Sequence, residues 1–351
     1  MGITVEDFGT LATGEMTHLY TITNKNGNQV AITDFGGIIV KLIIKDKDGN
    51  PKDVVLGFDK VKPYTKDVNC YGAIVGPIAN RTAGAAFTIG DKKYKLEVND
   101  GVNNLHTSAK EGFQKRLWKA KKGKDSITLT LLKKDKEMGH PGKMHVTVTY
   151  TFTDKDELII SYESDTDKET VINMTNHTYF ALNGHDDTNI LHERLWINAD
   201  NYTPIHKGGI PTGKIAKVKG SPMDFTNKEG REVCEKFTFN NKMIGYCNGY
   251  DINMVLNNYN GKNRLVATLW DDVSHIKMDT YTDLPGIQFY TGNWVGEKAA
   301  KGKVPYGPRQ GLCLETQFYP NVANEKNFPQ AVYGPKKAYK TTTTYAFSIF
   351  K

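Results

Sequence analysis

The sequence predicts an all-β protein built as one large antiparallel β-sandwich with few short helices. Apolar and polar residues alternate with a period of two in many segments, as they do in half-buried strands. Glycine next to Asn or Asp recurs between these segments, which is typical of tight hairpin turns. Helical periodicity is nearly absent. Hairpins at short spacing along the whole chain favour a sandwich of packed sheets.

Three turn signals stand in the first hundred residues. Residues 25–28 read Lys-Asn-Gly-Asn, residues 47–50 read Lys-Asp-Gly-Asn, and residues 89–92 read Ile-Gly-Asp-Lys. Each is flanked by segments rich in β-branched or alternating residues. We therefore expect a hairpin at each of these turns.

The clearest hairpin lies in the middle of the chain. In residues 145–152, two Val, a Tyr and a Phe alternate with a His and three Thr, so that one face is apolar and the other polar. A polar tip at 154–157 follows, and then an apolar strand at 158–162. This pattern predicts two adjacent antiparallel strands.

Other segments complete the expected elements. Residues 126–132 and 341–350 alternate as strands do, and short helices are expected only within 109–118 and 228–236. Neither a fixed-period repeat nor a Pro/Gly/Ser linker divides the sequence. Residues 1–351 are therefore expected to form a single domain.

Composition excludes several classes of protein. The chain is 38% hydrophobic and 11% aromatic, enough apolar surface to offset the entropy of ordering. Its net charge of +7 is spread over scattered lysines, and the basic run at 115–122 is interpreted as a solvated strand edge, so no nucleic-acid partner is expected. No apolar run approaches the roughly 20 residues that a membrane span needs. The first ten residues have no secretory signal pattern, so we expect a soluble protein.

The cysteines indicate a reducing compartment. They are far apart and form no CxxC pair, so we expect buried, reduced thiols and a cytoplasmic location. Four N-glycosylation patterns occur, and two of them fall inside the expected active site, where a glycan would block the cleft. These residues are Cys70, Cys234, Cys247 and Cys313, and Asn80, Asn173, Asn176 and Asn201.

Four segments are rich in polar residues set among glycines and aromatics: residues 76–84, 99–106, 173–184 and 312–321. In the last of these, Glu315 interrupts an apolar strand. A carboxylate there is costly to bury, so its pKa should be perturbed. Taken singly, a histidine or a strand glutamate in such a segment is more often structural than catalytic.

Together the motifs carry a family resemblance. The chain resembles the aldose 1-epimerases, or galactose mutarotases, over nearly its whole length, with the motifs in the family's order. Residues 137–142 resemble the family's Gly-x-Pro-Gly loop, although His140 stands where the family commonly has Tyr. The matching motifs are Asn80-Arg81, Asn104 to His106, Thr175 to Phe180 with Leu182 to Gly184, Gly249 to Asp251, and Leu314 to Gln317.

The resemblance implies a fold, an activity and a set of partners. The fold is the galactose-mutarotase β-supersandwich. The activity is an isomerase that interconverts the α and β anomers of free hexoses such as galactose and glucose. The resemblance implies no cofactor, a small-molecule hexose as the partner, and neither a nucleic acid nor a membrane. We expect a monomer or a homodimer.

The implied reaction needs one base and one acid. A cyclic aldose opens when its anomeric hydroxyl loses a proton and its ring oxygen gains one; rotation about C1–C2 and reclosure give the other anomer. The resemblance assigns the base to Glu315 and the acid to His177. We expect the nearby carboxylate to keep the imidazole charged near neutral pH.

The resemblance also implies residues that hold the sugar. His106 would hydrogen-bond near the ring oxygen, and the others would grip further hydroxyls. Trp294 is the aromatic nearest to a recognisable motif, but it is interpreted as a core residue. The implied substrate-binding residues are Asn80, Arg81, His106, Asp251 and Gln288.

Three other functions stay open at this stage. An epimerase of hexose 6-phosphates would need cations for the phosphate. A non-catalytic carbohydrate-binding sandwich would need no acid–base pair. A glycosidase could use Asp251 and Glu315 as its two carboxylates. The sequence has no HExxH, GxGxxG or GxxxxGK[ST] motif in a fitting context, so metal and nucleotide cofactors are not expected.

Overall fold

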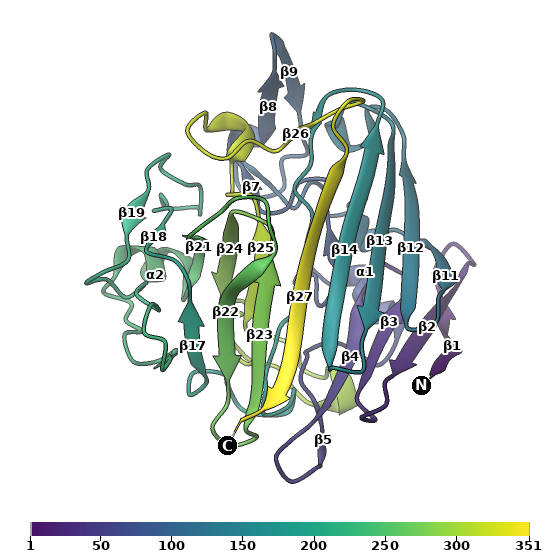
Figure 1. Cartoon of the computed structure of the whole chain (residues 1–351). Coiled ribbons are helices and arrows are strands. Elements are labelled where there is room, and N and C mark those ends of the chain that lie inside the picture. The colour runs from purple at the N-terminus through teal and green to yellow at the C-terminus, as the bar shows by residue number, and fades with distance from the viewer. Residues whose placement is uncertain (1, 351) are drawn as a thin grey trace.

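A nine-stranded sheet forms the front of the molecule in the computed structural model, which describes residues 2–350 (Figure 1). Its neighbouring strands are all antiparallel. In spatial order they are β11 (Lys119–Lys122), β12 (Ser126–Lys133), β13 (Met144–Phe152), β14 (Glu157–Thr166), β27 (Tyr339–Ile349), β23 (Ile276–Thr282), β22 (Arg264–Trp270), β17 (Arg194–Ile197) and β20 (Arg231–Glu232).

Two five-stranded sheets lie behind it. The first contains β1 (Gly2–Thr10), β2 (Met16–Thr23), β3 (Gln29–Thr33), β4 (Ile39–Lys45) and β5 (Pro51–Asp53), in that order. The second has the order β19 (Ala216–Lys217), β18 (Asn201–Tyr202), β21 (Asp251–Val255), β24 (Gly286–Tyr290) and β25 (Cys313–Gln317). Side chains of the front sheet bond to both layers.

Two tyrosines of the front sheet make these bonds. The hydroxyl of Tyr150 on β13 donates to the carbonyl of Gly37 beside the first five-stranded sheet, and that of Tyr345 on β27 donates to the carbonyl of Leu314 on β25. The fold is thus an open, layered, all-β sandwich, which confirms the predicted class.

Smaller elements connect the sheets. Two-stranded pairs are β6 (Ile74–Val75) with β16 (Thr175–Asn176), β7 (Arg81–Thr82) with β10 (Asn104–Leu105), β8 (Ala86–Ile89) with β9 (Lys92–Lys95), and β15 (Thr170–Val171) with β26 (Val332–Tyr333). The β8–β9 hairpin projects from the top of the molecule in Figure 1. The helices are α1 (Val61–Lys66) and α2 (Lys242–Cys247), with 3-10 turns at Ala83–Ala85, Phe113–Lys115, Glu137–Gly139, Lys301–Lys303 and Val322–Asn324.

The predicted hairpins are confirmed. The turns at 25–28, 47–50 and 89–92 join β2 to β3, β4 to β5 and β8 to β9. The alternation in the middle of the chain becomes β13 and β14, in which every second residue is buried. Polar residues therefore face outward on these strands because the inner face is packed against the other layers.

The predicted helices are largely wrong. Residues 109–118 contain only the 3-10 turn Phe113–Lys115, and the 228–236 region holds the short strand β20. The two α-helices lie elsewhere, and each has only six residues. Helices this short depend on tertiary contacts rather than on a readable periodicity.

The buried side chains form one large core cluster and a smaller one. The large cluster runs from Ile22 to Phe347 and takes in strands of all three large sheets. The smaller includes Tyr179 and Tyr290, which line the pocket described below. No helix among residues 2–350 is long and apolar enough to cross a membrane.

The four cysteines are all free thiols. Cys70, Cys247 and Cys313 are buried, as expected, but Cys234 is exposed, so the prediction was wrong for that residue. The basic run at 115–122 ends in β11, the edge strand of the nine-stranded sheet, which agrees with a solvated strand edge.

Candidate active site

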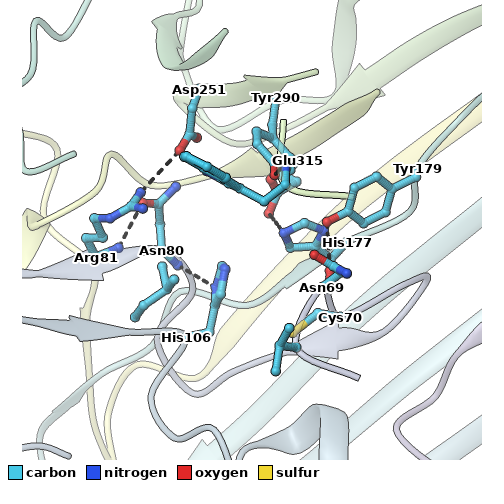
Figure 2. A pocket seen from close by; sticks show the side chains of 13 residues that line it. Asn69, Cys70, Asn80, Arg81, His106, His177, Tyr179, Asp251, Tyr290 and Glu315 are labelled. Carbon is cyan, nitrogen blue, oxygen red and sulfur yellow. Dashed lines mark hydrogen bonds and ion pairs between the residues drawn. The ribbon is translucent and has the colours of Figure 1, made fainter. Parts of the chain in front are cut away.

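A small pocket gathers residues from distant parts of the chain (Figure 2). Its volume of about 210 Å³ lies below the roughly 300–1,000 Å³ that is common for drug-sized ligands, which favours a small molecule. Six of the seven residues that the sequence proposed for the site line it. They are Asn80, Arg81, His106, His177, Asp251 and Glu315.

Glu315 lies at the centre of β25, whose five residues are all buried. It is only 2% exposed, and its Oε2 atom has no hydrogen-bond partner among the described residues. Burial raises the pKa of Glu315 well above the usual value; the carboxylate of Asp251 raises it further, and Arg81 opposes the shift. This shift agrees with the prediction that the pKa of this carboxylate is perturbed.

His177 follows β16 and faces Glu315, with 3.7 Å between its Nε2 and the Glu315 Oε2 (Figure 2). Its other ring nitrogen, Nδ1, lies 3.5 Å from the sulfur of Cys313. The rings of Tyr179 and His106 pack against it at centroid distances of 5.1 and 5.3 Å. The imidazole is therefore fixed in orientation.

The charge expected on His177 is not supported. Burial lowers its pKa to about 4, and this desolvation outweighs a hydrogen bond to the backbone of His177 itself and the attraction of the carboxylate of Asp251. The shifts of His177 and Glu315 both favour uncharged groups. The form of the pair that these shifts favour carries its one exchangeable proton on the carboxyl group, beside a neutral imidazole.

His106 presents a hydrogen-bond donor to the pocket. Its Nδ1 accepts from the backbone N–H of Asn80 at 3.1 Å, and burial lowers its pKa well below the usual value. In a neutral imidazole whose Nδ1 accepts, Nε2 carries the proton. Asn80 and His106 both have positive φ, 62° and 55°, so a local turn conformation brings these two residues together.

Arg81 is held between two carboxylates. Its Nε donates to Asp100 at 2.8 Å and its Nη1 to Asp251 at 3.3 Å. Burial opposes the charge, but these carboxylates raise the pKa of Arg81, which stays a cation. The planar guanidinium thereby orients Asp251 at the pocket wall.

Gln288 lies behind the pocket rather than in it. Its side-chain amide donates to Asp251 Oδ1 at 2.6 Å. Its oxygen accepts from Gln317 at 3.0 Å, and Gln317 in turn accepts from Asn80 at 3.4 Å. This chain of amides runs across β24 and β25, where Gln288 stands opposite Glu315. The structure thus makes Gln288 a support for Asp251.

The pocket rim carries exposed apolar side chains. Trp294 is 65% exposed and Val68 is 86% exposed, and both line the pocket. The interpretation of Trp294 as a core aromatic was therefore wrong. No sequence motif pointed to Asn69 and Cys70, which also line the pocket. Their loop is held there by a contact between distant parts of the chain, in which the hydroxyl of Tyr179 donates to the carbonyl of Asn69.

Two further residues could have been found. Tyr179 belongs to the same motif as His177, and Tyr290 follows Gln288 by two positions on β24; both line the pocket. His140, in contrast, is completely buried beside Phe87, at a ring-centroid distance of 5.3 Å, and does not line it. A sugar contact from the His140 loop is not supported.

One group among the described residues has the composition of a metal site. Ligand atoms of His177, Cys313 and Glu315 lie within 4.8 Å of one another. Cys313, however, contacts Nδ1 of the imidazole, and Glu315 faces Nε2. Because each ring nitrogen binds a separate partner, contacts on opposite ring nitrogens do not form the coordination shell of one ion.

Comparisons of the sequence with known proteins agree on one family. The family model described as aldose 1-epimerase matches residues 18–346. The chain is 36% identical to galactose mutarotase of Sus scrofa over 351 residues, 99% of both chains. It is 32% identical to aldose 1-epimerase of Escherichia coli (strain K12) over 337 residues, 95% of this chain and 96% of the relative.

Solved structures agree with this result. A crystal structure of an aldose epimerase homologue from C. elegans has a TM-score of 0.88 at 26% identity, covering 95% of this chain and all of that one (100%). The galactose 1-epimerase of Lactobacillus acidophilus has the same fold, with a TM-score of 0.86 at 24% identity and coverage of 100% and 99% of the two chains.

Proposed function

Because the chain belongs to the aldose 1-epimerase family, we propose that it interconverts the α and β anomers of free hexoses, with galactose and glucose as substrates. The family places it among the isomerases. The proposal about substrate and mechanism rests on the site described above.

The observation that carries the mechanism is the pair of Glu315 and His177 in a small pocket. Their facing atoms lie 3.7 Å apart, and both side chains are nearly buried. One carboxyl group and one imidazole are sufficient for ring opening, because the reaction only removes a proton from one oxygen and adds one to another. Each such group contributes on the order of 10²–10⁴-fold to the rate.

In the proposed reaction the pair starts with one proton. When this proton lies on His177, the carboxylate of Glu315 takes the proton of the anomeric hydroxyl, and Nε2 of His177 protonates the ring oxygen. The C1–O5 bond breaks, and the C1 carbonyl forms. Rotation about C1–C2 presents the other carbonyl face, and the reverse transfers close the ring. The resting form with two uncharged groups differs from this reactive form only in that the exchangeable proton lies on Glu315 instead of His177.

The other pocket residues are proposed to hold the sugar. His106 would donate from Nε2 near the ring oxygen and stabilise charge that develops there. Asn80, Arg81 and Asp251 would bind hydroxyl groups, and Gln288 would act through Asp251, to which it donates a hydrogen bond. All but Gln288 line the pocket.

The free sugar is favoured over a hexose 6-phosphate. Among the described residues that line the pocket, Arg81 is the one side chain that is cationic at neutral pH, and its Nε and Nη1 are already bound to Asp100 and Asp251. A phosphate would therefore meet two carboxylates and no free cation. A glycosidase role for Asp251 is also disfavoured, because both of its carboxylate oxygens already accept hydrogen bonds from Arg81 and Gln288.

The test is polarimetry on freshly dissolved α-D-galactose and α-D-glucose, with and without the purified protein. We expect faster decay of the optical rotation to the same end point, and the ratio of the two rates gives the sugar preference. Decay at the uncatalysed rate for both sugars would contradict the proposal. Glucose 6-phosphate serves as the comparison that distinguishes a phosphate-specific epimerase.

A further inference from the structure

The Nδ1 atom of His177 lies on the side of the ring opposite to Nε2, the nitrogen that faces Glu315. It lies 3.5 Å from the sulfur of Cys313, within hydrogen-bond distance. Both side chains are buried, and Cys313 is a free thiol that is not exposed to solvent. The opposite ring nitrogen faces Glu315 (Figure 2).

Strand geometry explains why both groups reach one imidazole. Cys313 and Glu315 are two positions apart on β25, so their side chains leave the same face of the strand. His177 lies across from them, and its ring is held by Tyr179 and His106. The thiol and the carboxyl group therefore contact the ring through its two different nitrogens.

We propose that Cys313 is a positioning residue whose sulfur accepts a hydrogen bond from Nδ1–H of His177, so that Nε2 is the nitrogen that exchanges its proton. This inference rests on the proposed acid–base function and adds a residue to it. No covalent step is involved: the sulfur keeps its own proton throughout.

The chemical reason lies in the tautomers of imidazole. A neutral imidazole carries one proton, and the nitrogen without it is the one that can accept. If the proton sat on Nε2, the ring could not accept a proton from the Glu315 side. With Nδ1–H bound to sulfur, Nε2 alternates between accepting a proton and donating it to the sugar ring oxygen.

Burial keeps the thiol uncharged. Desolvation raises the pKa of Cys313 well above its usual value, and the neighbouring carboxyl of Glu315 adds to the effect. A neutral sulfur is a weak acceptor, so it can fix the tautomer without placing a negative charge beside the ring. A neutral thiol therefore does not stabilise the charged imidazolium, so the imidazole can return to its neutral form once it has protonated the sugar.

The direct test is ¹⁵N NMR of the protein labelled at its histidine ring nitrogens, with His177 assigned by comparison with His177→Asn. We expect the Nδ1 shift of a protonated nitrogen and the Nε2 shift of an unprotonated one in the resting enzyme at neutral pH. The reverse pattern, with Nδ1 unprotonated, would overturn the proposal by making the thiol a donor. This readout needs no change at Cys313.

Variants provide the kinetic test. Cys313→Ala should lower kcat about three- to tenfold with little change in KM, and should move the two ¹⁵N shifts toward a tautomer mixture. Cys313→Ser keeps an acceptor and should restore kcat to within about twofold of the original enzyme. Cys234→Ala, at the exposed cysteine, is the matched control and should change neither readout.

The outcomes separate this inference from the proposed function. Unchanged kcat and unchanged ¹⁵N shifts in Cys313→Ala would overturn the role of Cys313 while mutarotation by the unaltered enzyme still stands. Absence of mutarotation by the unaltered enzyme would instead overturn the proposed function itself.

Discussion

At the scale of single residues, turnover requires the pair of Glu315 and His177 to hold exactly one proton. With two protons the carboxyl group cannot act as a base, and with none the imidazole cannot act as an acid. The pKa of Glu315 is raised and that of His177 is lowered to about 4. The one-proton form therefore spans a wide pH range.

These shifts predict a bell-shaped dependence of kcat on pH with a broad top. As pH falls, His177 takes up the second proton near its pKa of about 4, and activity declines. As pH rises above the raised pKa of Glu315, the pair loses its last proton, and activity declines again. The profile is measured by polarimetry after subtraction of the buffer-catalysed rate. An acid limb centred at about 6.5, the value of an unperturbed histidine, would contradict this account.

Arg81 offers a second test at this scale. Its guanidinium bonds to Asp100 and Asp251 through two different nitrogens, which a lysine ammonium cannot reproduce in one plane. Arg81→Lys should raise KM for galactose about tenfold or more, with a smaller loss in kcat. Arg116→Lys, at a partly exposed ion pair with Glu137 outside the pocket, is the control. Equal KM values for both variants would refute the positioning role of Arg81.

Sequence motifs could predict which residues line the candidate site but not their charge states. Glu315 and His177 stand in recognisable segments, and the pocket indeed gathers them. The neutral form of His177 depends on how completely Tyr179, His106 and β25 enclose the ring, which no local pattern reveals. The place of Gln288 behind Asp251 likewise follows from strand register rather than from the motif.

At the scale of elements, the loop between β12 and β13 is held by a buried lysine. The ammonium of Lys133 donates to the carbonyls of Lys134, His140 and Gly142 at 3.0, 2.9 and 2.8 Å. The side chain is fully enclosed. Three carbonyl groups therefore depend on one cation, and the His140 loop has a structural role.

Lys133→Met should lower the free energy of unfolding by about 2–3 kcal/mol, because buried carbonyls lose their donor. The kinetic constants of the folded variant should not change, since the loop lies outside the pocket. Urea denaturation measures the effect, and Lys134→Met, at the exposed neighbouring position, is the control. If both variants were equally stable, the loop would not depend on Lys133.

Hairpins were predictable because their signals are local, whereas the helices were not. Period-two alternation and turn residues predict the hairpins β2–β3, β4–β5 and β13–β14 within a few residues. Helix α2 has only six residues, and its best signal is the N-cap Asn241, whose side chain accepts from the backbone N–H groups of Met243 and Ile244. Asn residues are also common in loops, so an Asn at this position is not sufficient by itself to predict a helix.

At the scale of the whole molecule, the C-terminal strand joins distant parts of the chain. β27 pairs with β14 on one side and with β23 on the other. The sequence could indicate that these segments are strands, but their order depends on distant pairings, and that of β14 with β27 spans more than one hundred residues, which no local pattern specifies. The large core cluster spans the same parts.

This arrangement leads us to propose that residues 1–351 fold as one cooperative domain. In urea, the loss of far-ultraviolet circular dichroism, the change in tryptophan fluorescence and the loss of mutarotation should coincide in a single transition. Two separated transitions would contradict the single domain. The cytoplasmic location and the choice between monomer and homodimer stay predictions.

The measurement that tests the central claim most directly is mutarotation of α-D-galactose by Glu315→Gln, together with calorimetric titration of galactose binding. The amide keeps the shape of the side chain but cannot take the proton of the anomeric hydroxyl. We predict a rate reduced by at least about 10²-fold, with the affinity for galactose changed only a few-fold. A variant that binds galactose and retains most of the original rate would show that Glu315 is not the base.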